Sequence, residues 1–141
     1  MEEYYFVLCS DDYTPGQFAR TVRPWHLCEK LYKPLVLEGK WEVGLVTCML
    51  ATPEPLPYMQ LVRLPFCESI MMVGGKSLLP VVKLLTKADS DDAIWNFDPP
   101  TYVPVNQKFI DTLEVYITDL EGNPPFAHGN SSFVLHLRKV K

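Results

Sequence analysis

Several features that define common protein classes are missing from this sequence. No run approaches 18 consecutive apolar residues, so we expect no transmembrane helix. The first residues, Met1-Glu2-Glu3-Tyr4, are acidic where a signal peptide is basic, and we therefore expect synthesis in the cytosol. A large excess of either sign of charge is also missing. The chain has 13 Lys and Arg against 17 Asp and Glu, for a net charge of -4. That balance provides no general attraction to nucleic acid or acidic membranes.

Catalytic and metal-binding motifs are absent as well. None of His26, His128 and His136 lies within four residues of another, and no C-x-x-C pair occurs, so we expect no metal site and no cofactor. Residues 75–77 (Gly-Lys-Ser) match the end of a P-loop, but Ile70 stands where that motif needs glycine, which favours a hairpin turn. We predict that the protein is not an enzyme. A catalytic site assembled from distant loops around His26 or His128 is the enzymatic alternative.

Proline is the residue in excess. The 141 residues include 13 prolines and only 7 glycines. Proline is thus about 9% of the chain, where about 5% is usual, and it is expelled from helix interiors and central strands. This excludes a helical bundle or coiled coil and points to short strands joined by stiff loops. With 48% apolar and 21% charged residues, we expect one packed domain over residues 1–141.

Four cysteines are spaced almost evenly along the first half of the chain, at Cys9, Cys28, Cys48 and Cys67. Four cysteines allow three disulfide pairings, which the sequence does not distinguish. Since we expect a cytosolic protein, we predict reduced, buried thiols.

About eight strands are predicted from apolar, aromatic and β-branched runs. Their spacing is typical of an antiparallel sandwich or barrel. We therefore expect an all-β fold, a single antiparallel β-sandwich with little helix. Residues 24–32 fit one or two helical turns, and residues 106–109 fit one. The predicted strands cover residues 4–9, 18–22, 41–50, 58–64, 66–73, 78–85, 112–119 and 132–140.

Alternation predicts which side chains face the core. The 41–50 strand is apolar on both faces toward its end, so we expect it to be central in its sheet. The loop over residues 87–100 carries Trp95 and Phe97, which we expect to pin it to the body. We also expect the last two strands to pair with each other, antiparallel. The predicted inward residues are Trp41, Val43, Leu45, Thr47 and Met49, then Leu113, Val115 and Ile117, then Phe133, Leu135 and Leu137.

Aromatic residues, 12% of the chain, are the best candidates for an interaction surface. Aromatic side chains outside the core are typical of protein interfaces. Apolar residues on nominally outward strand faces (Val46, Cys48, Leu50 and Tyr116) are candidates for subunit contacts or core. We expect no membrane partner, and nucleic-acid contact only weakly through Arg138, Lys139 and Lys141. The candidate interface residues are Trp25, Tyr58, Trp95, Tyr102, Tyr116 and Phe126.

Three stretches of sequence resemble one family in the same order. They are residues 34–45 (PLVLEGKWEVGL), residues 97–105 (FDPPTYVPV), and residues 117–126 (ITDLEGNPPF) with Gly129 and residues 135–138 (LHLR) after them. Together they are similar to β-rich proteins encoded by polinton/adintovirus-type elements and related DNA viruses of animals. Relatives with these motifs are longer, with an extra segment where this chain has only residues 51–61.

The resemblance implies a virion structural protein of jelly-roll type, which serves as a capsid, vertex (penton-like) or fibre-base component. It implies no catalytic residues. Its partners would be further copies of itself and other virion proteins. Its location would be the virion, after synthesis in the host cytoplasm, with nuclear assembly as an option. The alternative is a monomeric β-sandwich module that binds a carbohydrate or peptide with loop aromatics such as Trp25 or Trp95.

Overall fold

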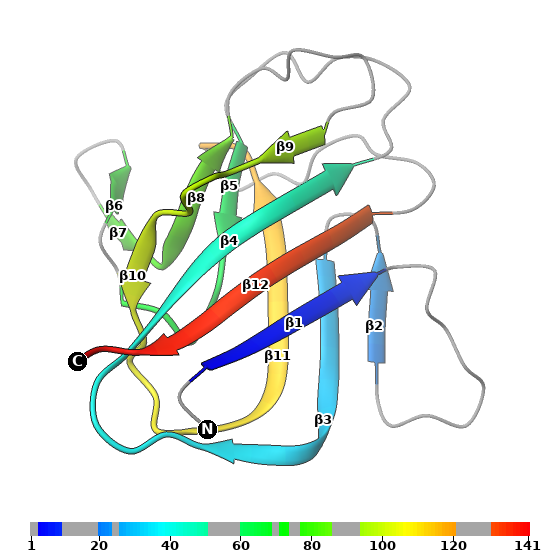
Figure 1. Ribbon diagram of the computed structural model, residues 1–141. Coiled ribbons are helices and arrows are strands. Elements are labelled where there is room, and N and C mark those ends of the chain that lie inside the picture. Colours follow the sequence, from blue (N-terminus) through cyan, green and yellow to red (C-terminus); the bar gives the residue numbers. More distant parts are fainter. Residues whose placement is uncertain are drawn as a thin grey trace.

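The computed structural model contains strands in every region that it describes (Figure 1). No α-helix is present in these regions, and nothing in them has the length and apolar content of a membrane-spanning helix. The all-β prediction is therefore confirmed. The described residues are 3–9, 20–23, 26–50, 60–68, 71–73, 77–85, 94–120 and 131–141.

One layer of the fold, sheet A, contains five strands. β1 (Glu3–Cys9) pairs with β12 (Ser131–Lys139), which pairs in turn with β4 (Trp41–Leu50). The far side of β4 pairs with both β10 (Tyr102–Pro104) and β9 (Ile94–Asn96). All these pairs are antiparallel, and β4 has partners on both sides, so the prediction that it is central is confirmed.

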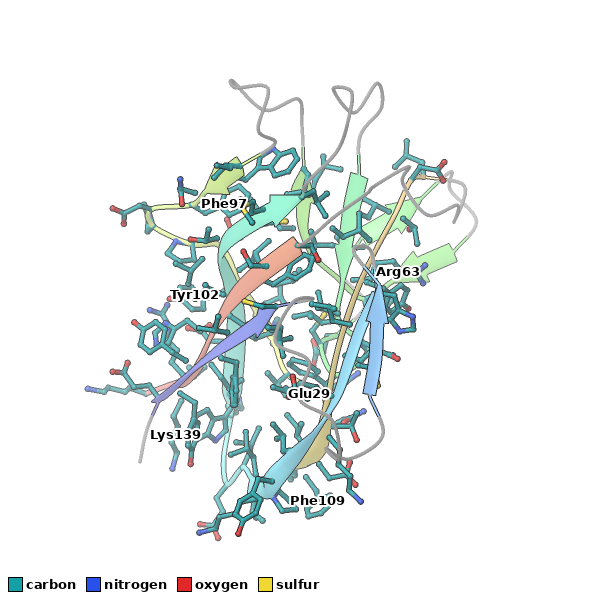
Figure 2. All side chains as sticks on the ribbon, turned by 90° about the vertical axis from the view of Figure 1, so that its right-hand side faces the viewer. Glu29, Arg63, Phe97, Tyr102, Phe109 and Lys139 are labelled. Atoms are coloured by element: carbon teal, nitrogen blue, oxygen red, sulfur yellow. The ribbon has the colours of Figure 1, made fainter. Side chains whose placement is uncertain are left out.

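The second layer, sheet B, also has five antiparallel strands. Their order is β2 (Arg20–Arg23), β3 (His26–Val36), β11 (Phe109–Thr118), β5 (Gln60–Arg63) and β8 (Val81–Leu85). Sheet B faces sheet A, as the side view in Figure 2 shows. The two sheets are the two layers of a β-sandwich.

The pairing of the strands is that of a jelly roll. The chain folds back on itself as a nested set of pairs, β1 with β12, β3 with β11, β4 with β10 and β5 with β8. The pairs β12–β4 and β11–β5 then join this set into two sheets. A double-sheet arrangement of eight strands in this order is a jelly roll. The other strands, β2, β6, β7 and β9, are short additions of three or four residues.

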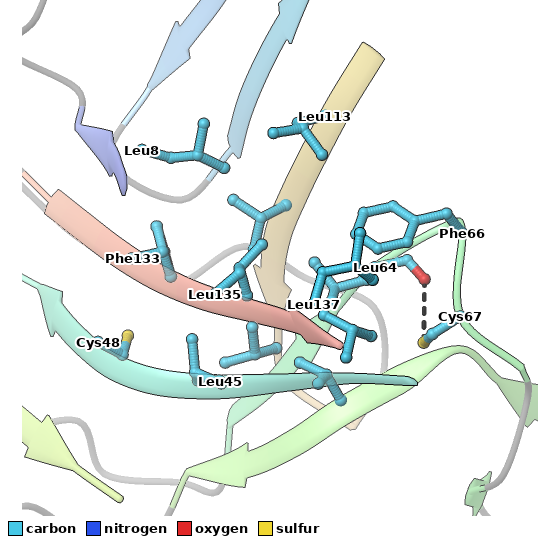
Figure 3. Packing of buried hydrophobic residues seen from close by; sticks show 14 of the residues in the cluster. Leu8, Leu45, Cys48, Leu64, Phe66, Cys67, Leu113, Phe133, Leu135 and Leu137 are labelled. Carbon is cyan, nitrogen blue, oxygen red and sulfur yellow. Dashed lines mark hydrogen bonds between the residues drawn. The ribbon is translucent and has the colours of Figure 1, made fainter. Parts of the chain in front are cut away.

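The core lies between the inner faces of the two sheets. The predicted inward sets of β11 and β12 are confirmed, because all six side chains are at most 2% exposed. They pack against Leu45 and Cys48 of β4, Leu8 of β1, and Leu64 and Phe66 (Figure 3). The apolar stripes that alternate along each strand are thus buried together, which supplies the main driving force for folding. The core residues of β11 and β12 are Leu113, Val115, Ile117, Phe133, Leu135 and Leu137.

A β-bulge reverses the predicted faces of β4 halfway along its length. Leu45 pairs with Leu135 and Thr47 with Val134, so Val46 has no opposite residue on β12. One extra residue shifts the alternation by one position. As a result Cys48 and Leu50 are fully buried, while Thr47 and Met49 are only half-buried. The prediction that Thr47 and Met49 face the core is therefore wrong, and Cys48 and Leu50 are core residues rather than subunit contacts.

Two further predictions are wrong. Residues 26–32 belong to strand β3 and form no helical turn. The sequence pattern was ambiguous here, because Leu27, Leu31 and Leu35 recur every four residues, and that spacing fits one face of a strand as well as one face of a helix. The last two strands do not pair with each other. β11 lies in sheet B and β12 in sheet A, so the chain crosses between the layers after residue 120.

The segment after β10 is extended where one helical turn was predicted. The Asn106 backbone N–H donates to the Phe66 carbonyl, and Val105 forms an antiparallel bridge with Cys67. This pairing with a distant segment replaces the local hydrogen bonds of a helix. Strand β11 begins directly afterwards, at Phe109.

Prolines and glycines divide the remaining strands as expected. Pro80 separates β7 (Ser77–Leu79) from β8, and its carbonyl accepts a hydrogen bond from Leu64. β6 (Met71–Val73) pairs antiparallel with β7, so the predicted hairpin at residues 74–77 is confirmed by its two arms, although residues 74–76 lie outside the described part. Gly39, with φ at 86°, allows the turn from sheet B into sheet A.

The thiols fit the expectation of reduced cysteines. Cys28, Cys48 and Cys67 are free thiols. Cys48 and Cys67 are completely buried as predicted, whereas Cys28 is only half-buried, so the prediction of burial is wrong for that residue. Trp95 belongs to the core and Phe97 packs against it, so both pin their segment to the body as predicted. The segment itself includes strand β9, which the sequence analysis treats as loop.

Candidate interaction surface

Strand β1 forms an open edge of sheet A. It stands at the end of the strand order and pairs residue by residue with β12, from Glu3 opposite Arg138 to Cys9 opposite Ser132. Its outer face carries Tyr5 and Val7, each 62% exposed. The inner face carries the core residue Leu8. β1 thus combines an unpaired backbone edge, among the described strands, with exposed apolar side chains.

At the opposite edge of sheet A, the end of β10 is engaged by the segment that follows β5. After β5 the chain passes beside the end of β10, where Cys67 forms an antiparallel bridge with Val105. The Glu68 N–H donates to the Pro104 carbonyl, and the Asn106 side chain donates to the Cys67 carbonyl. These bonds connect the two sheets on that side of the sandwich. The short strand β10 is therefore poorly suited to pairing with another chain.

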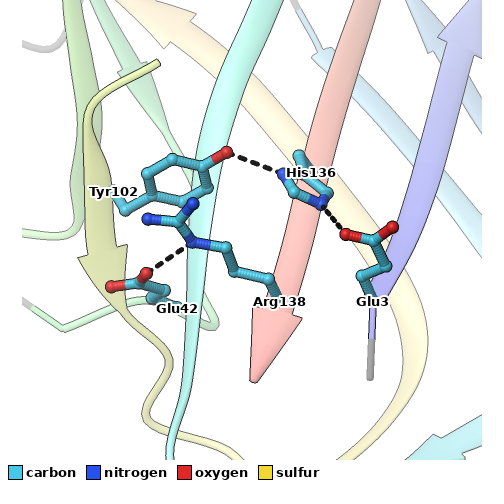
Figure 4. Close-up of polar contacts among 5 residues, drawn as sticks. All are labelled: Glu3, Glu42, Tyr102, His136 and Arg138. Carbon is cyan, nitrogen blue, oxygen red and sulfur yellow. Dashed lines mark hydrogen bonds and ion pairs between the residues drawn. The ribbon is translucent and has the colours of Figure 1, made fainter. Parts of the chain in front are cut away.

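A polar cluster on the outer face of sheet A fixes β1 to its neighbours (Figure 4). His136, on β12, is only 7% exposed although it faces outward. Its Nε2 lies 3.1 Å from a carboxylate oxygen of Glu3, and its Nδ1 lies 2.7 Å from the Tyr102 hydroxyl. The Tyr5 ring stacks on the imidazole at a centroid distance of 4.2 Å. One histidine therefore joins β1, β12 and β10.

Gly44 makes room for this cluster. In register, Gly44 of β4 lies between Tyr102 of β10 and His136 of β12. A Cβ atom there would come within 3.1 Å of the Thr101 carbonyl oxygen and of two ring atoms of Tyr102. A bare backbone at this position allows the tyrosine ring to lie over β4 and reach the histidine.

Arg138 completes the cluster from the next outward position of β12. Its guanidinium lies 3.5 Å from the centroid of the Tyr102 ring, and its Nε donates to Glu42 at 2.6 Å. Burial raises the pKa of Tyr102, and the positive charge of Arg138 opposes that rise. The hydroxyl therefore stays protonated at neutral pH.

The order of hydroxyl, imidazole and carboxylate also occurs in nucleophilic catalysis, which requires a nucleophile activated by a lowered pKa or an adjacent base. Here the pKa of the Tyr102 hydroxyl is shifted upward, which is the wrong direction for a nucleophile. The described residues also contain no group of three or more potential metal ligands. The cluster instead holds β1, β12 and β10 together.

The aromatic residues predicted for an interface do not form one surface. Trp95 is 8% exposed and belongs to the core, so it cannot stack on a sugar. Tyr102 belongs to the cluster on sheet A. Tyr116 lies on the outer face of sheet B, where Arg63 lies 4.8 Å from its ring and His26 packs against its edge. The other three, Trp25, Tyr58 and Phe126, lie outside the described residues.

Tyr5 and Val7 were not among the predicted interface residues, because residues 4–9 were predicted only as a strand. A signal was present, since residues 4–9 are apolar at every position. A strand of that composition is buried on both faces or leaves one apolar face exposed. Of the basic residues near the C-terminus, Arg138 is engaged with Tyr102 and Glu42 rather than presented to a partner.

Comparison with known proteins provides no family for this chain. A scan against known protein families finds no match, and a search of curated proteins finds no related sequence.

Proposed function

We propose that this chain is a virion structural protein, a jelly-roll subunit of a capsid, vertex or fibre base that assembles symmetrically with further copies of itself. The observation that carries the proposal is a jelly roll with one open, apolar sheet edge at β1. Jelly rolls build viral capsids, but also lectins and cupins, so the fold alone does not decide between functions. An exposed apolar edge strand favours assembly, because such edges associate with other chains.

The resemblance to animal DNA-virus proteins adds support through its location. Parts of the motif segments 34–45, 97–105 and 135–138 meet in sheet A, whereas Ile117 and Thr118 of the segment 117–126 lie on β11 in sheet B. Gly44 pairs with Tyr102 on one side and with His136 on the other. The similar residues thus surround the cluster that fixes β1.

A rigid edge suits a structural role. The contacts of Glu3 and Tyr5 with His136 hold the outer face of β1 in place before any partner arrives. Less conformational entropy is then lost on association, so more of the contact energy appears as affinity. We propose the virion as the site of function, with other virion proteins as further partners.

Self-assembly is tested on the purified chain by light scattering coupled to size-exclusion chromatography over a hundredfold range of concentration. We expect the mass to rise from monomer to a defined oligomer, with symmetric particles in negative-stain electron microscopy. A monomer at every concentration would count against the proposal. The virion role is tested by the genes beside this one. A major capsid protein, protease or packaging ATPase is expected there, and a neighbourhood of metabolic genes would refute the viral assignment.

A further inference from the structure

We infer that β1 is the contact between subunits, pairing antiparallel with β1 of a second copy across a twofold axis at Phe6. This inference rests on the proposed self-assembly and specifies its geometry. Two sheets A would then form one continuous sheet. The edge, the residue pattern and the charge of β1 each support this arrangement.

Within the described residues, β1 itself lacks several of the devices that keep sheet edges apart. Natural edge strands are blunted by proline, lysine, bulges or very short length. β1 has seven residues, contains neither proline nor lysine, and pairs with β12 without a register shift. The neighbouring edge of sheet B, β2, has four residues and carries Arg20 and Arg23. β1 is therefore better suited than β2 to accept another strand.

The residue pattern selects one register. Opposite residues of an antiparallel pair point to the same face, so odd positions must meet odd positions when the outer faces of both copies coincide. With the axis at Phe6, all seven residues of β1 have a partner. Tyr5 then lies opposite Val7 of the second copy, and Val7 opposite its Tyr5. Such an aromatic–β-branched pair is a favourable cross-strand contact, and this one covers two side chains that are 62% exposed in the single chain.

The charge distribution selects the antiparallel direction. Glu3 is the only charged residue of β1 and stands at its first position. Antiparallel pairing centred on Phe6 separates the two Glu3 residues by six positions, or about 20 Å at the usual rise along a strand. Parallel pairing in register would place them side by side, which is destabilising. The antiparallel ladder would contribute roughly six to eight backbone hydrogen bonds.

A lysine at the edge tests the inference. Val7→Lys places a charge opposite the partner's Tyr5 and should weaken association at least tenfold in sedimentation equilibrium. The matched control is Val36→Lys, since Val36 is 68% exposed on β3 in the other sheet. It makes the same change in sheet B, away from β1, and should alter association less than twofold. Circular dichroism and urea unfolding verify that both variants are folded.

The register is tested by cross-linking under mild oxidation, with the wild type as background. We expect a mixture of Tyr5→Cys and Val7→Cys chains to form disulfide-linked heterodimers in preference to either homodimer. Homodimers of Tyr5→Cys alone, or of Val7→Cys alone, would shift the axis to that residue and overturn the register centred on Phe6.

The outcomes separate the two proposals. If Val7→Lys assembles as well as the wild type, the β1 contact is wrong while self-assembly stands. The same holds if Val36→Lys weakens assembly as much as Val7→Lys does. If the wild type stays monomeric, including the case in which β1 serves a foreign peptide strand, self-assembly and the β1 contact are both overturned.

Discussion

Truncation of Leu50 and of its neighbour Met49 should have very different effects, because the bulge at Val46 decides which of them is in the core. Leu50 is fully buried, whereas Met49 is half-buried on the other face of β4. Without the bulge the assignments would be exchanged. The variants Leu50→Ala and Met49→Ala therefore test the local structure of β4 with two adjacent substitutions of similar size.

The expected magnitude follows from burial. Removing a fully buried leucine side chain costs about 2–5 kcal/mol, because the cavity left behind adds to the lost transfer energy. Truncating a half-buried side chain on the outer face should cost about 1 kcal/mol or less. In urea unfolding, a loss of about 3 kcal/mol lowers the midpoint by roughly 1.5 M at an m-value of about 2 kcal/mol/M. Met49→Ala should move the midpoint by less than about 0.5 M under the same conditions.

The measurement is urea unfolding followed by tryptophan fluorescence, with both variants and the wild type fitted at a common m-value. If Met49→Ala is as destabilising as Leu50→Ala, or more so, then β4 continues its simple alternation and the bulge is wrong. Cys48 would then be exposed too, which thiol labelling checks independently.

Three other outcomes are expected. At pH 8 the buried thiols of Cys48 and Cys67 should react with a disulfide reagent only as fast as the protein unfolds. Mass spectrometry of labelled peptides measures this rate, and rapid labelling of either thiol would contradict its burial. Burial raises the pKa of Cys67 to about 11 and that of Cys48 further still, so the folded chain retains protons that the unfolded chain releases above pH 8.5. The free energy of unfolding should therefore be fully maintained below that pH and fall above it, by up to about 1.4 kcal/mol per pH unit for each thiol. Urea titrations from pH 7 to 10 would reveal this fall, and a free energy of unfolding that does not change with pH would refute the raised thiol pKa values. Finally, Gly44→Ala should lower the free energy of unfolding by about 1–3 kcal/mol, because the added methyl group crowds Tyr102. Tyr102→Phe should lower it by about 1 kcal/mol, because it removes the hydroxyl that bonds to His136. Thermal unfolding measures both, and a Gly44→Ala variant as stable as the wild type would show that the Tyr102 ring has room to move.

Local alternation predicted much of the core. Leu113, Val115 and Ile117 on β11 are buried as expected, because a strand with a regular register converts a period of two directly into one buried face. The same rule failed beyond Val46. The bulge depends on how β4 meets β12, and the sequence of β4 alone contains no record of that partner.

The position of a strand in its sheet was harder to predict than its existence. Residues 4–9 were predicted as a strand, but its place at the open edge follows from the order of all the strands, which local patterns do not contain. For the same reason Trp95 was proposed for the surface although β9 turns it into the core. The alternation that buries Leu135 and Leu137 places His136 on the outward face of β12. Its burial comes from Tyr5 and Tyr102, which lie 131 and 34 residues away along the chain.

The nested order of strands has a consequence for how the protein is made. Glu3 and His136, whose side chains meet, are 133 residues apart in sequence, and β12 is inserted between β1 and β4. During synthesis β1 emerges well before β12 and can find its partner only after the residues between these two strands have left the ribosome. Pairings at such long range make folding slow and leave unpaired strands open to aggregation in the meantime. We therefore expect nascent chains that stop before β12 to depend on chaperones, because both β1 and β4 would then wait with bare edges.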